Sequence, residues 1–263
     1  MDATPRFSHD TLCFLKKAAR QKREDWLEMH WSEYEEVVLE PLKNLAQTLK
    51  SSLGHLAPHY NFPQKGIGRL KRSSKSAAQY GGGIYKDWVS YSAARPRQSR
   101  FETNPNVFFL INTEDPKDPV LIAGGLYMPS SRQMKLLREA IARDPSPFEK
   151  LFETKDFAQS FPKGFSDEKI AKRIPRGFDP DHRRMDWLRL QAFFVWKPYS
   201  MREFYSRDFA ALVVRDSKQI LRLNKLLEQA LEGRAQVAVP KIKPSALINR
   251  LEEIERIERK SDF

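Results

Sequence analysis

The chain has 263 residues, of which 40% are apolar and 11% aromatic, so it can bury a substantial core and global disorder is excluded. No apolar run approaches the roughly 18 residues of a membrane span, and residues 1–10 lack the charged-then-apolar pattern of a signal peptide, which predicts a cytoplasmic protein with no membrane partner. Cys13 is the only cysteine, which excludes an intramolecular disulfide and disfavours a zinc-thiolate site, so we expect neither a metal nor a cofactor.

The net charge of +12 is concentrated in one segment of the chain. Residues 65–100 hold nine Lys and Arg side chains against one acidic side chain, Asp87, and so contribute eight of the twelve net charges. Such a block favours an anionic partner, because a basic surface attracts phosphates. The alternative is that this segment binds nothing and is a solvent-exposed loop whose charge keeps it soluble.

The first 55 residues are predicted to be helical. Ser8 is suited to cap a first helix, and Ser32 and Glu35 have the spacing of a capping box that opens a second one. Pro41 kinks or restarts that helix, because it lacks a backbone N–H. Cys13 lies on the first helix, where we expect it to be a small core residue rather than a nucleophile.

Two apolar runs in the middle of the chain, residues 107–111 and 120–128, predict strands. The first run is apolar at every position, which favours a strand buried on both faces. Gly124-Gly125 in the second run predicts a bulge or a close backbone approach. Ser130-x-x-Gln133 then has the form of a capping box. The helix that it opens has a candidate anion site at its start, although most helix starts bind nothing.

The segment up to residue 231 adds two expected strands and one candidate site. Residues 188–196 predict a third strand and residues 211–214 a fourth, and Asp216 is suited to cap a helix over residues 217–231. His182 has two aspartates within three positions, Asp179 and Asp181. It is a candidate acid–base group, but a structural hydrogen bond is the commoner role for such a histidine.

The last 32 residues differ from the rest of the chain. Residues 232–243 predict an extended link, and residues 244–260 a charged amphipathic helix with an apolar stripe. We expect the stripe to dock on the chain's own body or, alternatively, on a second subunit. The stripe consists of Leu247, Leu251, Ile254 and Ile257.

Several motifs occur in an order that resembles the bacterial family called domain of unknown function 2461. The resemblance covers about residues 7–231 and implies an α+β domain with an antiparallel-type sheet, but it supplies no activity. The residues that carry it are Phe7, Phe14, Leu15, the run Arg23-Glu24-Asp25-Trp26-Leu27, Tyr34, Pro41, Gly124, Gly125, Tyr127, Pro129, Leu137, Arg138, Ile141, and the run from Pro175 to His182.

The chain departs from the family pattern over residues 69–81. Family members carry Arg-Asp-x-Arg-Phe-Ser-x-Asp-Lys-x-Pro-Tyr-Lys there, and in this chain Leu70 and Ser76 replace the two aspartates. Arg69 and Arg72 match and lose their local carboxylate partners, which favours a bound anion or simple exposure. The loss also argues against acid–base chemistry by those aspartates.

We therefore predict an α+β fold, with a central, mainly antiparallel sheet packed with helices and mostly helical N- and C-terminal parts. Residues 1–231 are expected to form one domain.

The first functional hypothesis is a binding module for an anionic, phosphate-bearing ligand or nucleic acid. Its ligand-binding residues would be Arg69, Arg72, Lys75, Tyr80, Arg138 and Arg176, with Tyr80, Tyr85 and Trp88 able to stack on bases.

Two other hypotheses stay open. The second is a hydrolase-type enzyme that uses His182 with Asp179 or Asp181, although no established catalytic motif is present. The third is an interaction scaffold that docks a protein partner through residues 244–260 or through the basic segment.

Overall fold

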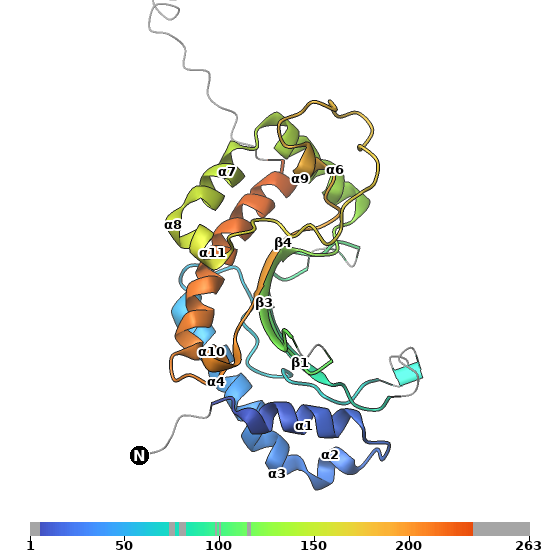
Figure 1. Ribbon diagram of the computed structural model, residues 1–263, viewed down its shortest axis with the longest axis vertical. Helices are drawn as coiled ribbons and strands as arrows, with labels where there is room; N and C mark the ends of the chain where they lie inside the picture. The colour runs from blue at the N-terminus through green and yellow to red at the C-terminus, as the bar shows by residue number, and fades with distance from the viewer. Residues whose placement is uncertain are drawn as a thin grey trace, which may run out of the picture.

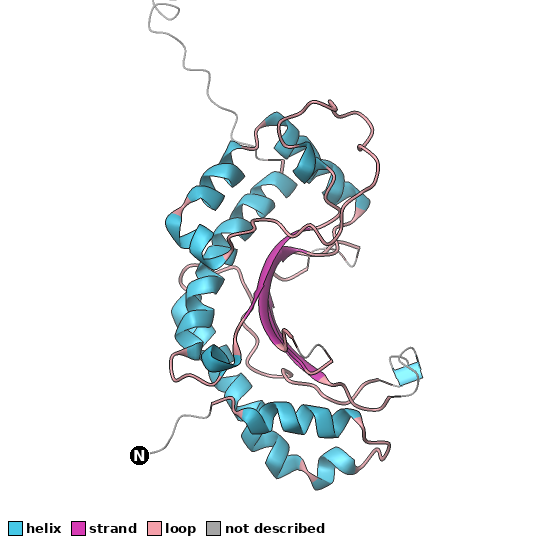
Figure 2. Cartoon of the chain, in the orientation of Figure 1, coloured by secondary structure: helices cyan, strands magenta, loops and turns pink. Residues whose placement is uncertain are grey.

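The computed structural model describes residues 6–73, 77–78, 83–97, 99, 101–114 and 117–233. Within them a four-stranded sheet lies beside a larger set of helices, so the predicted α+β class is confirmed (Figures 1 and 2). The helices are α1 His9–Ala19, α2 Trp26–Met29, α3 Trp31–Tyr34, the π-helix η1 Glu35–Leu39, α4 Glu40–Leu53, α6 Ser131–Arg143, α7 Ser146–Glu153, α8 Lys155–Ser160, α9 Met185–Leu188, α10 Met201–Phe204 and α11 Phe209–Leu231.

The sheet is antiparallel throughout, with its strands in chain order. Its strands are β1 Trp88–Ala94, β2 Asn106–Asn112, β3 Val120–Leu126 and β4 Phe193–Pro198. The strands expected at residues 107–111 and 120–128 are therefore confirmed as β2 and β3. The third expected strand begins later than predicted, because Leu188 ends helix α9 instead.

The sheet is curved, and its helices are arranged around it unequally (Figure 1). Helix α11 packs on β3 and β2, and α4 packs on α11, so these two helices lie on the convex side. Helices α1 to α3 lie at one end of the molecule and α6 to α9 at the other (Figure 1). Among the described residues, no helix packs across the concave side.

The N-terminal helices follow the predicted signals in part. The Ser8 side chain accepts from the backbone N–H of Asp10 and so caps α1 as expected. Ser32 opens no helix, because it lies inside α3, which runs directly into η1 and α4. Cys13 was wrongly assigned to the core: its side chain is exposed, with its Sγ 3.2 Å from Nδ1 of His9.

The fourth expected strand is wrong, since residues 211–214 belong to α11. Val213 lies on the face of that helix that is buried against the sheet, so packing overrides the strand preference of its β-branched side chain. Asp216 is likewise not a cap. It lies two turns inside α11 and is fully buried.

Residues 234–263 lie outside the described part. The extended link, the amphipathic helix over residues 244–260 and the domain boundary at residue 231 therefore stay predictions.

Candidate functional site

The two faces of the sheet differ in how much of them is covered. Side chains alternate in and out along each strand, and on β2 Val107, Phe109 and Ile111 are buried against the helices. The intervening Phe108 and Leu110 point to the concave side and are only half-buried. The described residues therefore do not bear out burial on both faces, because they leave the second apolar face of this strand only half-buried.

The open face forms a groove with a volume of about 530 Å³. The strand register aligns Phe108 with Ala123, and Ala123 with Trp196, so that one apolar row crosses three strands. Leu110 and Leu121 form a second row. We call this surface the concave groove; it is lined by Asn106, Phe108, Leu110, Asn112, Asp118, Leu121, Ala123, Gly124, Gly125, Tyr127, Glu168, Phe194 and Trp196.

The two glycines of β3 permit close approaches, Gly124 to α11 and Gly125 to the backbone of β4. A Cβ on Gly124 would lie 2.0 Å from Cγ2 of Ile220, so only glycine lets this part of α11 approach the strand. Gly125 has a φ of +116°, and a Cβ there would lie 2.3 Å from the carbonyl oxygen of Phe193. The close backbone approach predicted for this pair is confirmed.

Basic side chains gather at one end of the groove, where β1 begins. Lys86 Nζ donates to the carbonyl oxygen of Arg69 at 2.7 Å and lies 4.2 Å from the ring centre of Trp88. Burial, together with the nearby Arg72 and Arg69, lowers the pKa of Lys86. Trp88 is aligned with Asn112, a groove residue. We call Arg69, Arg72 and Lys86 the basic corner; Asp87 is its nearest described acid, 3.8 Å from Arg72.

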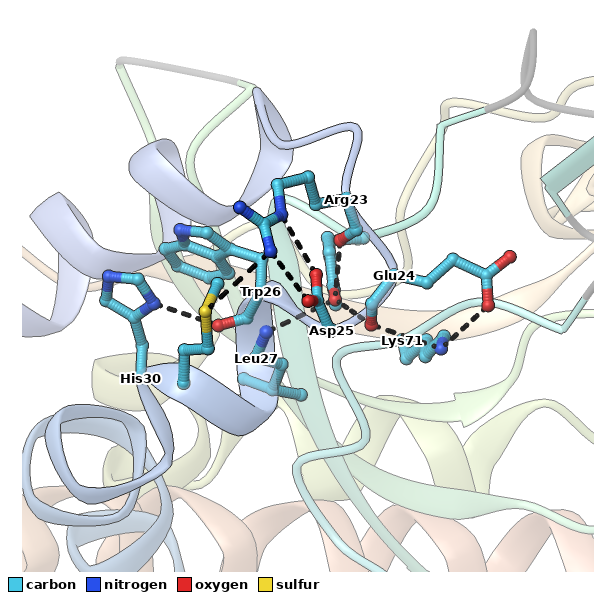
Figure 3. Close-up of polar contacts among 9 residues, drawn as sticks. Arg23, Glu24, Asp25, Trp26, Leu27, His30 and Lys71 are labelled. Carbon is cyan, nitrogen blue, oxygen red and sulfur yellow. Dashed lines mark hydrogen bonds and ion pairs between the residues drawn. The ribbon is translucent and has the colours of Figure 1, made fainter.

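The segment that carries the basic corner is anchored to the N-terminal helices (Figure 3). The Tyr85 hydroxyl donates to the carbonyl oxygen of Glu24 at 2.7 Å and accepts from the backbone N–H of Leu27 at 3.3 Å. Lys71 Nζ contacts both the carbonyl and the carboxylate of Glu24 at 3.3 Å. The 23–27 motif of the family resemblance therefore holds this segment beside the sheet.

The cations predicted to converge on an anion are not brought together. Arg138 donates to the carbonyl oxygens of Leu188 at 2.8 Å and Leu190 at 3.0 Å, near the start of β4, and burial lowers its pKa. The basic corner lies at the start of β1, at the diagonally opposite corner of the sheet. Strands of six or seven residues, with three inter-strand spacings, put these corners roughly 25 Å apart.

The remaining predicted ligand residues lie elsewhere or outside the described part. Arg176 is exposed on the loop before α9, and Lys75 and Tyr80 lie outside the described residues. Of the predicted set, only Arg69 and Arg72 lie side by side. A ligand-binding role for any of them stays a prediction.

The ring nitrogens of His182 are both engaged by backbone groups. Nδ1 accepts from the N–H of Arg184 at 3.1 Å, so Nε2 carries the proton and donates to the carbonyl oxygen of Ala142 at 3.2 Å. Asp179 instead accepts from the backbone N–H of Asp181. The geometry thus favours the structural role of His182, and catalysis by this set stays a prediction.

The start of α6 has the predicted capping box. The Ser130 side chain accepts from the N–H of Gln133 at 3.2 Å, and the Gln133 side chain accepts from the N–H of Ser130 at 3.0 Å. Arg132 beside it is paired with Glu102 at 2.7 Å. The anion site expected at this helix start stays a prediction.

A second hollow, of about 710 Å³, lies near this helix start and the end of α11. It is polar, and Arg95 within it pairs with Glu228 at 3.2 Å and with Glu232 at 3.3 Å. Burial raises the pKa of Glu228, whose carboxylate accepts from the hydroxyl of Tyr60. Because these charges already pair with each other, the concave groove is the better candidate for binding a partner.

Sequence reasoning missed the groove residues on β3 and β4. The sequence signal that could have found them is that β2 is apolar on both faces, which predicted a buried strand rather than an exposed binding surface. Among the described residues, no three His, Cys, Asp or Glu side chains gather as a metal site, and no helix is both long and apolar enough to cross a bilayer.

Comparison with known proteins gives one match. The family model described as "Conserved hypothetical protein (DUF2461)" matches residues 10–225. No curated protein and no solved structure matches the chain.

Proposed function

Because the chain belongs to the DUF2461 family, whose description assigns no activity, we propose a function from geometry: the protein is a binding module whose concave groove takes an amphipathic protein segment. The observation that carries this proposal is the half-buried apolar face of a central strand, Phe108 and Leu110 on β2. An apolar sheet face that the protein's own helices leave open is typical of an interaction surface.

The groove fits a protein segment better than a phosphate-rich ligand. Its rows of Phe108, Ala123 and Trp196 and of Leu110 and Leu121 are apolar, and its acidic members, Asp118 and Glu168, repel phosphates. Aliphatic and aromatic residues of an amphipathic helix can bury against such rows, while its polar face stays in water.

A phage-displayed random peptide library tests this proposal without knowledge of the natural partner. Selected peptides should share an i, i+3, i+4 apolar spacing. Ala123→Arg should weaken their binding by about tenfold or more, because it places a long charged side chain on the apolar groove floor, where it blocks the apolar rows. Ala211→Arg is the matched control on the exposed side of α11 and should leave affinity within about twofold.

Two outcomes would overturn the proposal. One is the absence of any enriched peptide, both for the native chain and for a chain whose residues 244–260 have been made polar. The other is a set of enriched peptides whose affinity is insensitive to Ala123→Arg.

A second candidate, anion or nucleic-acid binding, is favoured by the basic corner. Burial first, and then the nearby Arg72 and Arg69, lower the pKa of Lys86, and an anion would relieve the repulsion among these three cations. Trp88 beside Lys86 offers a ring on which a base can stack.

Titration with pyrophosphate and with single-stranded DNA, at several salt concentrations, tests this second candidate. Arg69→Gln with Lys86→Gln should weaken binding by about tenfold and flatten the salt dependence, whereas Arg176→Gln should change little. DNA binding that does not vary with salt, or equal loss in the Arg176 variant, would exclude the basic corner as the site.

A further inference from the structure

The concave groove has a candidate occupant within the same chain. Resting on the proposed function, we infer that residues 244–260 dock in the concave groove as an intramolecular amphipathic segment, and so compete with outside partners for it. The inference is carried by where the chain leaves the described body, by its length and by its chemistry.

The chain leaves the described body near one end of the sheet. Glu232, just after α11, pairs with Arg95 at 3.3 Å. Arg95 directly follows Ala94, the last residue of β1, and Ala94 is aligned with Asn106, which lines the groove. The last described residue, Gly233, therefore lies near the Asn106 end of the sheet but on the side of α11, so the following chain must pass around the sheet edge to reach the groove.

The remaining length suits this path. The eleven-residue step from Gly233 to residue 244 can span up to about 36 Å when extended, enough to pass around the sheet edge. A 17-residue helix over residues 244–260 is about 25 Å long. The seven-residue strands beneath it are about 23 Å long, so the helix would match the length of the groove floor.

The apolar face of the segment matches the apolar rows of the groove. Its apolar stripe of Leu247, Leu251, Ile254 and Ile257 can bury on the apolar rows of the groove. A segment that enters beside Asn106 runs toward the other end of β2, where Asn112 is aligned with Trp88. Residues 244–260 hold four glutamates and four Lys and Arg side chains, so the apolar stripe rather than net charge carries the match.

Cross-linking in the full-length chain tests the inference. In a Cys13→Ser background, Ala123→Cys is combined with Leu251→Cys on the apolar stripe, and a short bis-maleimide is added. An intramolecular contact should give a cross-linked monomer about tenfold faster than the controls, at a rate independent of protein concentration.

Two matched controls define the contact. Ala123→Cys with Glu253→Cys probes the polar side of the same segment, and Lys218→Cys with Leu251→Cys probes the exposed side of α11. Equal rates in all three proteins would overturn the inference. A cross-linked dimer whose yield falls on dilution would also overturn it, because the occupant would then be the segment of a second copy.

A second measurement separates this inference from the proposed function. Leu251→Glu with Ile254→Glu in the full-length chain should increase the affinity of library peptides about tenfold, because it releases the groove. Peptide binding that depends on Ala123 but is unchanged by this variant overturns the inference and leaves the proposed function standing. Selective cross-linking of the monomer without any peptide binding supports the inference and overturns the proposed function.

Discussion

At the scale of single residues, the buried carboxylate of Asp216 has the most polar contacts. Its two oxygens accept from Ser160 at 2.8 Å and Tyr199 at 2.8 Å, and they contact Lys197 at 2.6 Å and Arg215 at 3.1 Å. These partners come from α8, β4 and α11, so the carboxylate joins the sheet to two helices. A buried charge is tolerated when it is paired and hydrogen-bonded in this way.

We predict that Asp216→Ala destabilises the protein by about 3–5 kcal/mol, because the partly buried Lys197 ammonium and the buried Tyr199 hydroxyl lose their partner. Urea unfolding measures the loss. Asp208→Ala, an exposed aspartate just before the same helix whose side chain makes no cap hydrogen bond, should cost less than about 0.5 kcal/mol. A similar small loss for both variants would show that the Asp216 contacts contribute little.

The sequence did not reveal the role of Asp216. An aspartate before a helical apolar stripe is a good capping candidate, and the two hydroxyls that donate to its carboxylate, on Tyr199 and Ser160, lie 17 and 56 positions away. The role of His182 was easier to predict, because a structural hydrogen bond was one of the two roles that the sequence suggested for it. Its partner, Ala142, is still 40 positions distant, and no local pattern identifies it.

At the scale of elements, helix starts were predicted best when the cap was local. The Ser8 and Ser130 caps depend on residues two and three positions away, so sequence spacing alone describes them. Ser32 had the same spacing but lies inside a continuous run of helix from Trp31 to Leu53. There the backbone N–H groups already have helical partners, and a capping side chain has nothing to satisfy.

We predict that Ser130→Ala destabilises the protein by about 1 kcal/mol, because the first turn of α6 loses a side-chain acceptor. Thermal unfolding checks this value. The neighbouring Ser131→Ala is the control, since Ser131 is an exposed first helical residue and alanine is a better helix former. A loss in Ser131→Ala as large as that in Ser130→Ala would argue against the cap.

The strand β2 shows how an element can be correct while its environment is wrong. Its position was predicted within one residue at each end. Its apolar character on both faces was correctly noted but led to the expectation of burial on both faces. Strand periodicity reports which side chains share a face, but it does not report whether another layer covers that face.

At the scale of the whole molecule, several tyrosines are buried between layers that are distant in the sequence. Burial raises the pKa of Tyr34 to about 12, and it raises the pKa values of Tyr60, Tyr91 and Tyr199 as well. The nearby Asp216 carboxylate adds to the rise at Tyr199, as Glu228 does at Tyr60.

We predict from these shifts that stability falls at alkaline pH. Each of these tyrosines has a higher pKa in the folded protein than in the unfolded chain. Its contribution to the free energy of unfolding is therefore complete below the unfolded-state pKa of about 10, and it is lost as the pH rises through the folded-state pKa. For Tyr34 this window runs from pH about 10 to about 12. Urea unfolding across that range should show the decrease, and Tyr34→Phe should make it shallower. A stability that does not change between these pH values would contradict the prediction.

The sequence by itself determined the α+β class, the family resemblance, the central strands, the close approach at Gly124-Gly125 and two helix caps. These features depend on residues near one another in the chain or on backbone freedom at single positions. Only the tertiary structure decided that Arg69 and Arg138 lie at opposite corners of the sheet. It also decided that the buried Asp216 carboxylate contacts residues from several elements, and that the described helices leave the concave face uncovered. Those outcomes depend on which distant elements pack together, and the position of a residue in the chain does not specify the direction its side chain faces once the layers have formed.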